Sequence, residues 1–209
     1  MSDNHRVPSE QTVIPRLIVI LGGARSGKSA FAERLAVSSE RSVAFIATAT
    51  AGDDEMRERI ARHRASRPKG WHTLEEPLDL AGAVRTASNL ADVLLLDCIT
   101  LWLANWLFQR YRTNDEEELA SSALIDEEAL QKEVEALLEA MNLLAPNKTL
   151  IVVTNEVGLG IVPAYPLGRV YRDALGYVNQ CLAHAADRVY LMVAGLAVDI
   201  KRLQEEASL

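Results

Sequence analysis

The chain has 209 residues, of which 49% are hydrophobic and 24% are charged, and its formal net charge is −7. This composition is ordinary for one globular domain, and the acidic balance argues against nucleic acid as the main partner. Two cysteines provide neither a disulfide framework nor a metal-ligand spacing, which favours a reducing cytoplasmic compartment. No apolar run is long enough for a membrane span, and the polar N-terminus lacks the apolar core of a secretory signal.

Strand-like and helix-like patterns alternate along the chain. Residues 1–15 are expected to form a flexible extension, and residues 16–209 a single domain. Short apolar runs predict strands over residues 17–21, 42–47, 71–74, 93–97, 149–154 and 188–193. Helices are predicted over residues 28–37, 53–64, 78–90, 101–108, 125–144 and 167–186. This order predicts an α/β fold with one doubly wound, mostly parallel sheet.

The motif that organises the domain is GGARSGKS, which follows the first predicted strand. It matches the phosphate-loop pattern G-x-x-x-x-G-K-[ST] between a strand and a helix, and so predicts a P-loop NTPase architecture. The N–H groups of such a loop bind phosphate oxygens at the start of a helix. The predicted phosphate-binding residues are Gly22, Gly23, Ala24, Arg25, Ser26, Gly27, Lys28 and Ser29. Lys28 is expected to lie exposed and to reach the β- and γ-phosphates.

Two residues are predicted to ligate Mg²⁺, namely Ser29 through its hydroxyl and Asp97 through its carboxylate. Asp97 ends a continuous apolar run, at the edge where α/β sheets place ligand groups. The alternative for Asp97 is a helix cap. The alternative for the whole motif is a glycine-rich turn without a ligand, which the Lys-Ser pair disfavours.

A strongly charged segment places His63 among Arg62, Arg64 and Arg67. These positive charges are expected to lower the pKa of the histidine and to keep its imidazole neutral. A neutral imidazole is a nucleophile, and the guanidinium groups neutralise a phosphate that it attacks. From the residues alone, a catalytic histidine and an exposed surface histidine remain equally open alternatives.

Residues 101–108 are apolar nearly all round if they form a helix. A monomer would not easily cover this much apolar surface on one side of the helix, which predicts a homo-oligomer. The residues concerned are Trp102, Leu103, Trp106, Leu107 and Phe108. The alternative is an ordinary buried helix.

Several further motifs accompany the phosphate loop in a fixed order. They are Ile46-Ala-Thr48, Asp53-Asp-Glu-Met56, His63-Arg64-x-x-Arg67-Pro68, Trp71-x-Thr73-x-Glu75, Thr154-Asn-Glu-Val-Gly-x-Gly160-Ile-Val-Pro163 and Arg172-Asp-x-x-Gly176-x-x-Asn179-Gln180. Over residues 16–201 the set resembles the bifunctional adenosylcobinamide kinase/adenosylcobinamide-phosphate guanylyltransferase family. The resemblance implies a homotrimer that phosphorylates adenosylcobinamide with ATP or GTP. It also implies transfer of GMP from GTP to adenosylcobinamide phosphate, through a guanylylated histidine, giving adenosylcobinamide-GDP.

Carried over by this resemblance, His63 is the guanylylated residue and the phosphate loop binds triphosphate. The other implied nucleotide contacts are Ala47, Thr48, Ala49, Arg64, Ala65, Ser66, Arg67, Glu75 and Asp97. Glu75 is expected to accept hydrogen bonds from guanine. Some relatives have a second histidine at the position of Arg62, and some have glutamate at the position of Asp97.

Later segments of the sequence are less specific. Residues 155–163 are rich in glycine and are interpreted as a substrate loop, and Arg172, Gly176 and Asn179 as a substrate wall or an interface. Two rival functions remain. One is a simple P-loop small-molecule kinase without a covalent intermediate, and the other is a nucleotide-binding regulatory module.

Overall fold

The structure is a computed structural model, and it describes residues 14–50, 54, 57–58, 61, 64–65, 67–110 and 126–207. Its strands are β1 (Leu17–Gly22), β2 (Val43–Ala47), β3 (His72–Glu75), β4 (Val93–Asp97), β5 (Thr149–Val153), β6 (Arg188–Val193) and β7 (Leu196–Asp199). Its helices are α1 (Lys28–Ser38), α3 (Leu80–Ser88), α4 (Ile99–Arg110), α6 (Glu127–Asn142), α7 (Pro166–Ala185) and α8 (Ile200–Ala207). Residues 1–13 of the predicted extension (residues 1–15) and most of the predicted helix at 53–64 lie outside the described residues.

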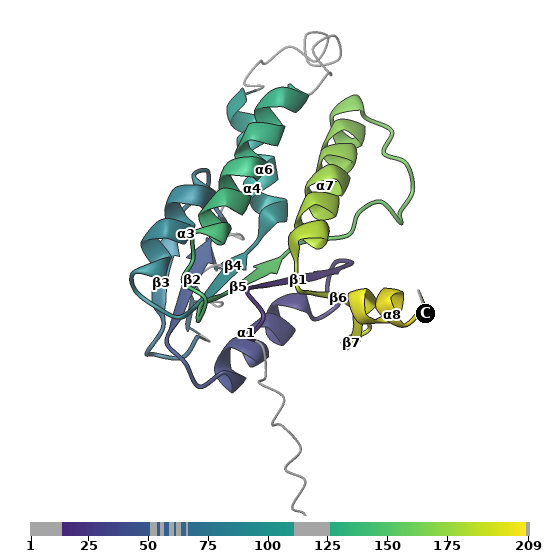
Figure 1. The fold of residues 1–209 in the computed structure, drawn as a ribbon. Coiled ribbons are helices and arrows are strands. Elements are labelled where there is room, and N and C mark those ends of the chain that lie inside the picture. Colours follow the sequence, from purple (N-terminus) through teal and green to yellow (C-terminus); the bar gives the residue numbers. More distant parts are fainter. Residues whose placement is uncertain are drawn as a thin grey trace, which may run out of the picture.

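The strands form one seven-stranded sheet in the order β3-β2-β4-β5-β1-β6-β7. Every pairing from β3 through β6 is parallel, whereas β7 pairs with β6 antiparallel. Figure 1 shows α3, α4, α6 and α7 together on one face of the sheet and α1 on the other. The predicted α/β fold with a mostly parallel sheet is therefore confirmed. Among the described residues, no helix is both long and apolar enough to cross a membrane.

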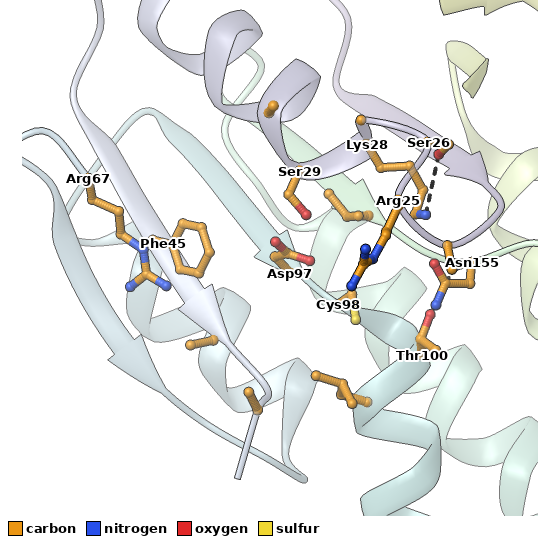
Figure 2. Close-up of a pocket in the computed structure, with 17 residues that line it drawn as sticks. Arg25, Ser26, Lys28, Ser29, Phe45, Arg67, Asp97, Cys98, Thr100 and Asn155 are labelled. Carbon is orange, nitrogen blue, oxygen red and sulfur yellow. Dashed lines mark hydrogen bonds between the residues drawn. The ribbon is translucent and has the colours of Figure 1, made fainter. Parts of the chain in front are cut away.

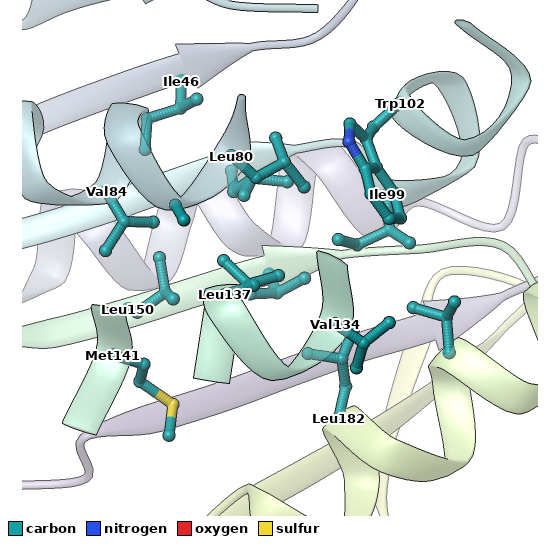
Figure 3. Close-up of a cluster of buried hydrophobic side chains, with 14 of the residues drawn as sticks. Ile46, Leu80, Val84, Ile99, Trp102, Val134, Leu137, Met141, Leu150 and Leu182 are labelled. Carbon is teal, nitrogen blue, oxygen red and sulfur yellow. The ribbon is translucent and has the colours of Figure 1, made fainter. Parts of the chain in front are cut away.

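The central strands are apolar on both faces because both faces are covered. Leu80 from α3, Trp102 from α4, Leu137 from α6 and Leu182 from α7 belong to one buried cluster with Leu150 of β5 (Figure 3). Side chains that point to the other face pack against the small residues of α1 instead. This alternation explains why the sequence shows continuous apolar runs rather than a two-residue period.

Aspartate side chains determine where two of the helices begin. The Asp79 carboxylate accepts a hydrogen bond from Gly82 N at 2.7 Å, and Asp126 accepts one from Ala129 N at 2.9 Å. Each is the N-cap of its helix, so α3 and α6 start two residues later than the apolar pattern predicts.

The argument from α4 to an oligomer is wrong for four of its five residues. Trp102, Leu103, Trp106 and Leu107 are all buried within this chain, and the Trp102 indole donates a hydrogen bond to Leu78 O at 2.8 Å. Phe108 alone of the five is exposed. The apolar helix packs against α7, and its buried side chains belong to the same cluster as those of α3 and α6. The local sequence does not show these distant partners.

The last two elements, β7 and α8, were not predicted from the sequence. β7 is a short edge strand with exposed side chains, and its connection to β6 is the two-residue turn Ala194–Gly195. Both turn residues have positive φ, 51° and 85°, as tight hairpins require. Lys201 of α8 donates to Ala183 O and His184 O at the end of α7, which anchors the hairpin to the rest of the fold.

Candidate active site

The site lies where the parallel strands end. The register pairs Asp97 of β4 with Ala47 of β2 on one side and with Val153 of β5 on the other. The loop after β1 closes over this edge, and together these segments line a cavity of about 570 Å³ (Figure 2). A cavity at the carboxyl edge of an open parallel sheet is where ligands bind in such folds.

Most of the predicted site residues are brought together by this edge. Those that line the cavity are Ala24, Arg25, Ser26, Gly27, Lys28, Ser29, Ala47, Ala49, Arg67 and Asp97. Figure 2 shows Arg25 extending from the loop toward Cys98, with Lys28 beside Ser26 and Ser29 near Asp97.

Two glycines give the phosphate loop its path. Gly22 has a φ of 148°, and a Cβ there would lie 2.5 Å from Met192 O of β6. Gly27 has a φ of 95° and is the N-cap of α1 without any side-chain capping bond. The start of α1 therefore presents backbone N–H groups that can donate hydrogen bonds to a phosphate oxygen. Arg25, with a φ of 58°, also takes the left-handed conformation in this turn.

The hairpin between β6 and β7 supports the same loop from behind. Gly195 N donates a hydrogen bond to Ser26 O at 3.0 Å. A Cβ placed on Gly27 would lie only 3.4 Å from the Gly195 Cα, so the two backbones pack closely. The loop motif itself contains no signal for this distant partner.

Lys28 is buried at 7% exposure, which corrects the expectation that it would be exposed. The loop curls around its ammonium, and Nζ donates to Gly23 O at 2.6 Å and lies 3.5 Å from Ser26 Oγ. Burial lowers the pKa of Lys28, although the negative charge of Asp97 opposes that shift. The ammonium nevertheless lies at the cavity wall, where it can reach a bound phosphate.

Ser29 and Asp97 supply oxygen donors on the same side of the cavity. Figure 2 shows the Ser29 hydroxyl and the Asp97 carboxylate directed toward each other across the space below α1. A hydroxyl and a carboxylate at this position fit the oxygen ligands that Mg²⁺ prefers.

Three predicted nucleotide contacts have other partners. Thr48 is fully buried, and its hydroxyl accepts from Cys98 N at 2.8 Å and donates to Cys98 O at 2.7 Å. Arg64 and Glu75, both exposed, form an ion pair with Nη1 and Oε1 3.2 Å apart. The guanine contact of Glu75 stays a prediction, and Arg64 would compete for the same carboxylate. Ala65 is exposed, and His63 and Ser66 lie outside the described residues.

Of the three residues predicted to form one face of α7, Asn179 has a structural role. Asn179 is buried, accepts a hydrogen bond from Thr154 Oγ1 at 2.8 Å and donates one to Asn155 O at 2.9 Å. It therefore forms neither a substrate wall nor an interface. Arg172 pairs with its neighbour Asp173.

Comparison of the sequence with known protein families gives a match over most of the chain. Residues 18–200 match the family described as cobinamide kinase / cobinamide phosphate guanyltransferase. The chain belongs to this family. The resemblance noted from the motifs is thereby confirmed over nearly the same range.

Relatives in this family cover most of the chain. It is 48% identical to the bifunctional adenosylcobalamin biosynthesis protein CobP of Pseudomonas aeruginosa, over 88% of this chain and 96% of that protein. It is 42% identical to the bifunctional adenosylcobalamin biosynthesis protein CobU of Escherichia coli, over 88% of this chain and 99% of that protein.

Among solved structures, an ATPase from the type III secretion system of pathogenic bacteria has a similar fold. The TM-score is 0.52 at 12% identity, over 91% of this chain and 53% of that one. At this identity the likeness concerns the fold alone.

In this member of the cobinamide kinase / guanyltransferase family, Arg67 packs on an aromatic ring, a contact that the sequence did not predict. The Arg67 guanidinium carbon lies 3.5 Å from the centre of the Phe45 ring, and Trp71 stacks on Phe45 at 6.4 Å. Burial lowers the pKa of Arg67. A phenylalanine in an apolar strand gives no signal of this role, because it is read as ordinary core.

Cys98 and Thr100 also line the cavity without having been predicted, and Asn155 lines it as the first residue of the predicted substrate loop. Asn155 N donates to Thr100 Oγ1 at 2.8 Å, which joins the end of β5 to the start of α4. Burial raises the pKa of Cys98 to about 11, so its thiol stays protonated at neutral pH.

Proposed function

We propose that the protein catalyses two steps of cobalamin biosynthesis. It phosphorylates the hydroxyl of adenosylcobinamide with a nucleoside triphosphate, ATP or GTP. It then transfers GMP from GTP to adenosylcobinamide phosphate, giving adenosylcobinamide-GDP. The observation that carries the proposal is a phosphate-loop cavity holding Lys28, Ser29 and Asp97, in a chain whose family combines these two activities.

In the kinase step, the loop N–H groups and Lys28 bind the triphosphate and neutralise its charge. The oxygen of the acceptor hydroxyl attacks the γ-phosphorus and releases its proton, while the bond between that phosphorus and the β–γ bridging oxygen breaks and the nucleoside diphosphate leaves. In the second step, a nitrogen of His63 attacks the α-phosphorus of GTP, and pyrophosphate leaves. An oxygen of the acceptor phosphate then attacks the phosphoramidate and regenerates the imidazole.

The test of this proposal uses GTP labelled at either the α- or the γ-phosphate. Label from the α-phosphate should become attached to the protein and pass to the acceptor phosphate when it is added. Label from the γ-phosphate should pass to adenosylcobinamide without staying on the protein. A protein that transfers γ-label but never retains α-label would be the simple kinase, and one that turns over neither would be the regulatory module.

We also propose that Ser29 and Asp97 hold Mg²⁺, which when bound supplies positive charge to the triphosphate. Replacing Asp97 by asparagine removes the anionic ligand but keeps the shape. The Mg²⁺ concentration at half-maximal kinase activity should therefore rise by about 10- to 100-fold. Asp92→Asn is the matched control, because Asp92 lies directly before β4, at the end opposite Asp97, and pairs with Lys148. Identical Mg²⁺ titrations for Asp97→Asn and the natural protein would contradict this assignment.

The homotrimer implied by the family resemblance is part of the same proposal. It is supported by large apolar side chains on the surface, including Phe108 of α4 at 66% exposure. Static light scattering should give a mass about three times the 23.0 kDa of one chain. A mass of one chain at micromolar concentration would defeat the prediction. We place the reaction in the cytoplasm, supported by the free thiols of Cys98 and Cys181.

A further inference from the structure

The connection from β5 to α7 carries an unusual concentration of exposed apolar side chains. Leu159 is 86% exposed, Ile161 97%, Val162 60% and Tyr165 80%. Other large exposed hydrophobic side chains of the described residues are spread over several elements. Single exposed hydrophobic residues need no explanation, whereas four within seven positions indicate a binding surface.

This connection begins at the nucleotide cavity. Asn155 lines the cavity, and Glu156 N donates to Gly22 O, the first residue of the phosphate loop, at 3.0 Å. Figure 1 shows the segment leaving the end of β5 beside β1 and running along the outside of α7. Its far end is tied to α7, because Arg169 Nη1 donates to Pro163 O at 3.0 Å and to Ala164 O at 2.7 Å. Both ends are thus anchored while the apolar middle faces outward.

The size of the cavity limits what can enter it. A volume of about 570 Å³ suits one drug-sized ligand, and a nucleoside triphosphate on the phosphate loop takes up most of it. A corrinoid macrocycle is larger than a nucleotide and has broad apolar faces with polar amides around its rim. Only the side arm with the reacting group can therefore reach the phosphates, and the ring must rest on surface next to the cavity mouth.

We propose that Leu159, Ile161, Val162 and Tyr165 bind the corrinoid ring of the acceptor, so that its side arm points into the cavity. This inference rests on the proposed function, and it assigns the acceptor site that the nucleotide residues leave open. The four side chains contact the apolar face of the ring. Their anchor at Gly22 fixes the ring at one distance from the phosphate loop in both reactions.

The test is a double variant, Leu159→Ser with Ile161→Ser, measured for acceptor and nucleotide separately. The KM for adenosylcobinamide in the kinase step and for its phosphate in the transfer step should both rise by about 10- to 100-fold. Equilibrium dialysis of the coloured corrinoid without nucleotide should show a matching loss of affinity. The KM for the triphosphate should change less than about twofold, since the phosphate loop is untouched.

Two control proteins make the result specific. Leu143→Ser removes an equally exposed side chain, at 80%, that follows α6 at the opposite edge of the sheet, and should leave acceptor KM unchanged. Leu159→Ile with Ile161→Leu keeps the apolar surface and should retain the natural acceptor affinity. A merely structural loop would not show this rescue together with an unchanged nucleotide KM.

The outcomes separate this inference from the proposed function. If the natural protein never retains label from α-labelled GTP and never phosphorylates the corrinoid, the proposed function fails. If it does both, and the serine variant binds corrinoid like the natural protein, the inference alone is overturned. A variant that dissociates in light scattering but keeps acceptor affinity would likewise overturn it, because the loop would then be a contact between copies of the chain.

Discussion

Replacing His63 by asparagine should abolish GMP transfer and covalent labelling by GTP, while phosphorylation of adenosylcobinamide continues. Transfer of a phosphoryl group to an alcohol needs positioning and charge neutralisation rather than a protein nucleophile. Guanylyl transfer through an intermediate needs the imidazole lone pair, which asparagine lacks. The measurement is uptake of α-labelled GTP by the variant, with kinase activity assayed in the same preparation.

The chemical character of the label gives an independent check. A phosphoramidate on histidine is labile to acid and stable to base, and a serine phosphoester behaves differently. Labelling should also decline at acidic pH, because a protonated imidazole has no free lone pair. His72→Asn is the matched control, since His72 is an exposed histidine at the start of β3. Labelling that survives in His63→Asn and disappears in His72→Asn would move the nucleophile.

Replacing Lys28 by alanine should lower kcat/KM for both reactions by about 10²- to 10³-fold, the usual effect of losing one preorganised charge-stabilising donor. The reason is that each step develops charge on a triphosphate held by the same loop. Circular dichroism should show a folded protein, because Lys28 is enclosed by loop backbone rather than by the hydrophobic core. Steady-state turnover equal to that of the natural protein would exclude the loop as the working site.

Lys148→Ala is the matched control for Lys28→Ala. Lys148 is also a partly buried lysine whose Nζ donates to a backbone carbonyl, Ala91 O at 2.9 Å, but it lies at the other edge of the sheet. It should lose stability without losing activity. The pH profile adds a further expectation, because burial lowers the pKa of Lys28. As the pH rises through this lowered value the ammonium loses its charge, so activity should fall at a less alkaline pH than an ordinary lysine would give.

The parts of the fold that could be predicted are those in which a local sequence pattern is compatible with only one structure. Continuous apolar runs such as β4 and β5 lie between covered faces, and the phosphate-loop spacing places a strand before it and a helix after it. The motifs that accompany the phosphate loop indicated the family, which the comparison with known proteins confirms. Asp97 was placed correctly because the end of a buried strand and the edge of the sheet coincide.

The rest depends on contacts between distant segments. Nothing local distinguishes Thr48, which holds Cys98, from a threonine that faces a ligand. The burial of Lys28 follows from the curl of the loop. The burial of Asn179 follows from its hydrogen bond with Thr154, which comes directly after β5. The Ala194–Gly195 turn was missed because β7 is short and exposed, so its alternation is too weak to detect.

Because Gly195 N donates a hydrogen bond to Ser26 O, the conformation of the phosphate loop depends on a residue outside the motif. Its eight residues transplanted to another strand and helix would lack the backbone that supports Ser26 and the carbonyl that excludes a side chain at Gly22. Judged by its position alone, Gly195 is a residue of a surface turn with open space around it, and a substitution there would be expected to have little effect. Because its φ of 85° disfavours any side chain, such a change would instead alter the nucleotide site from the far end of the chain.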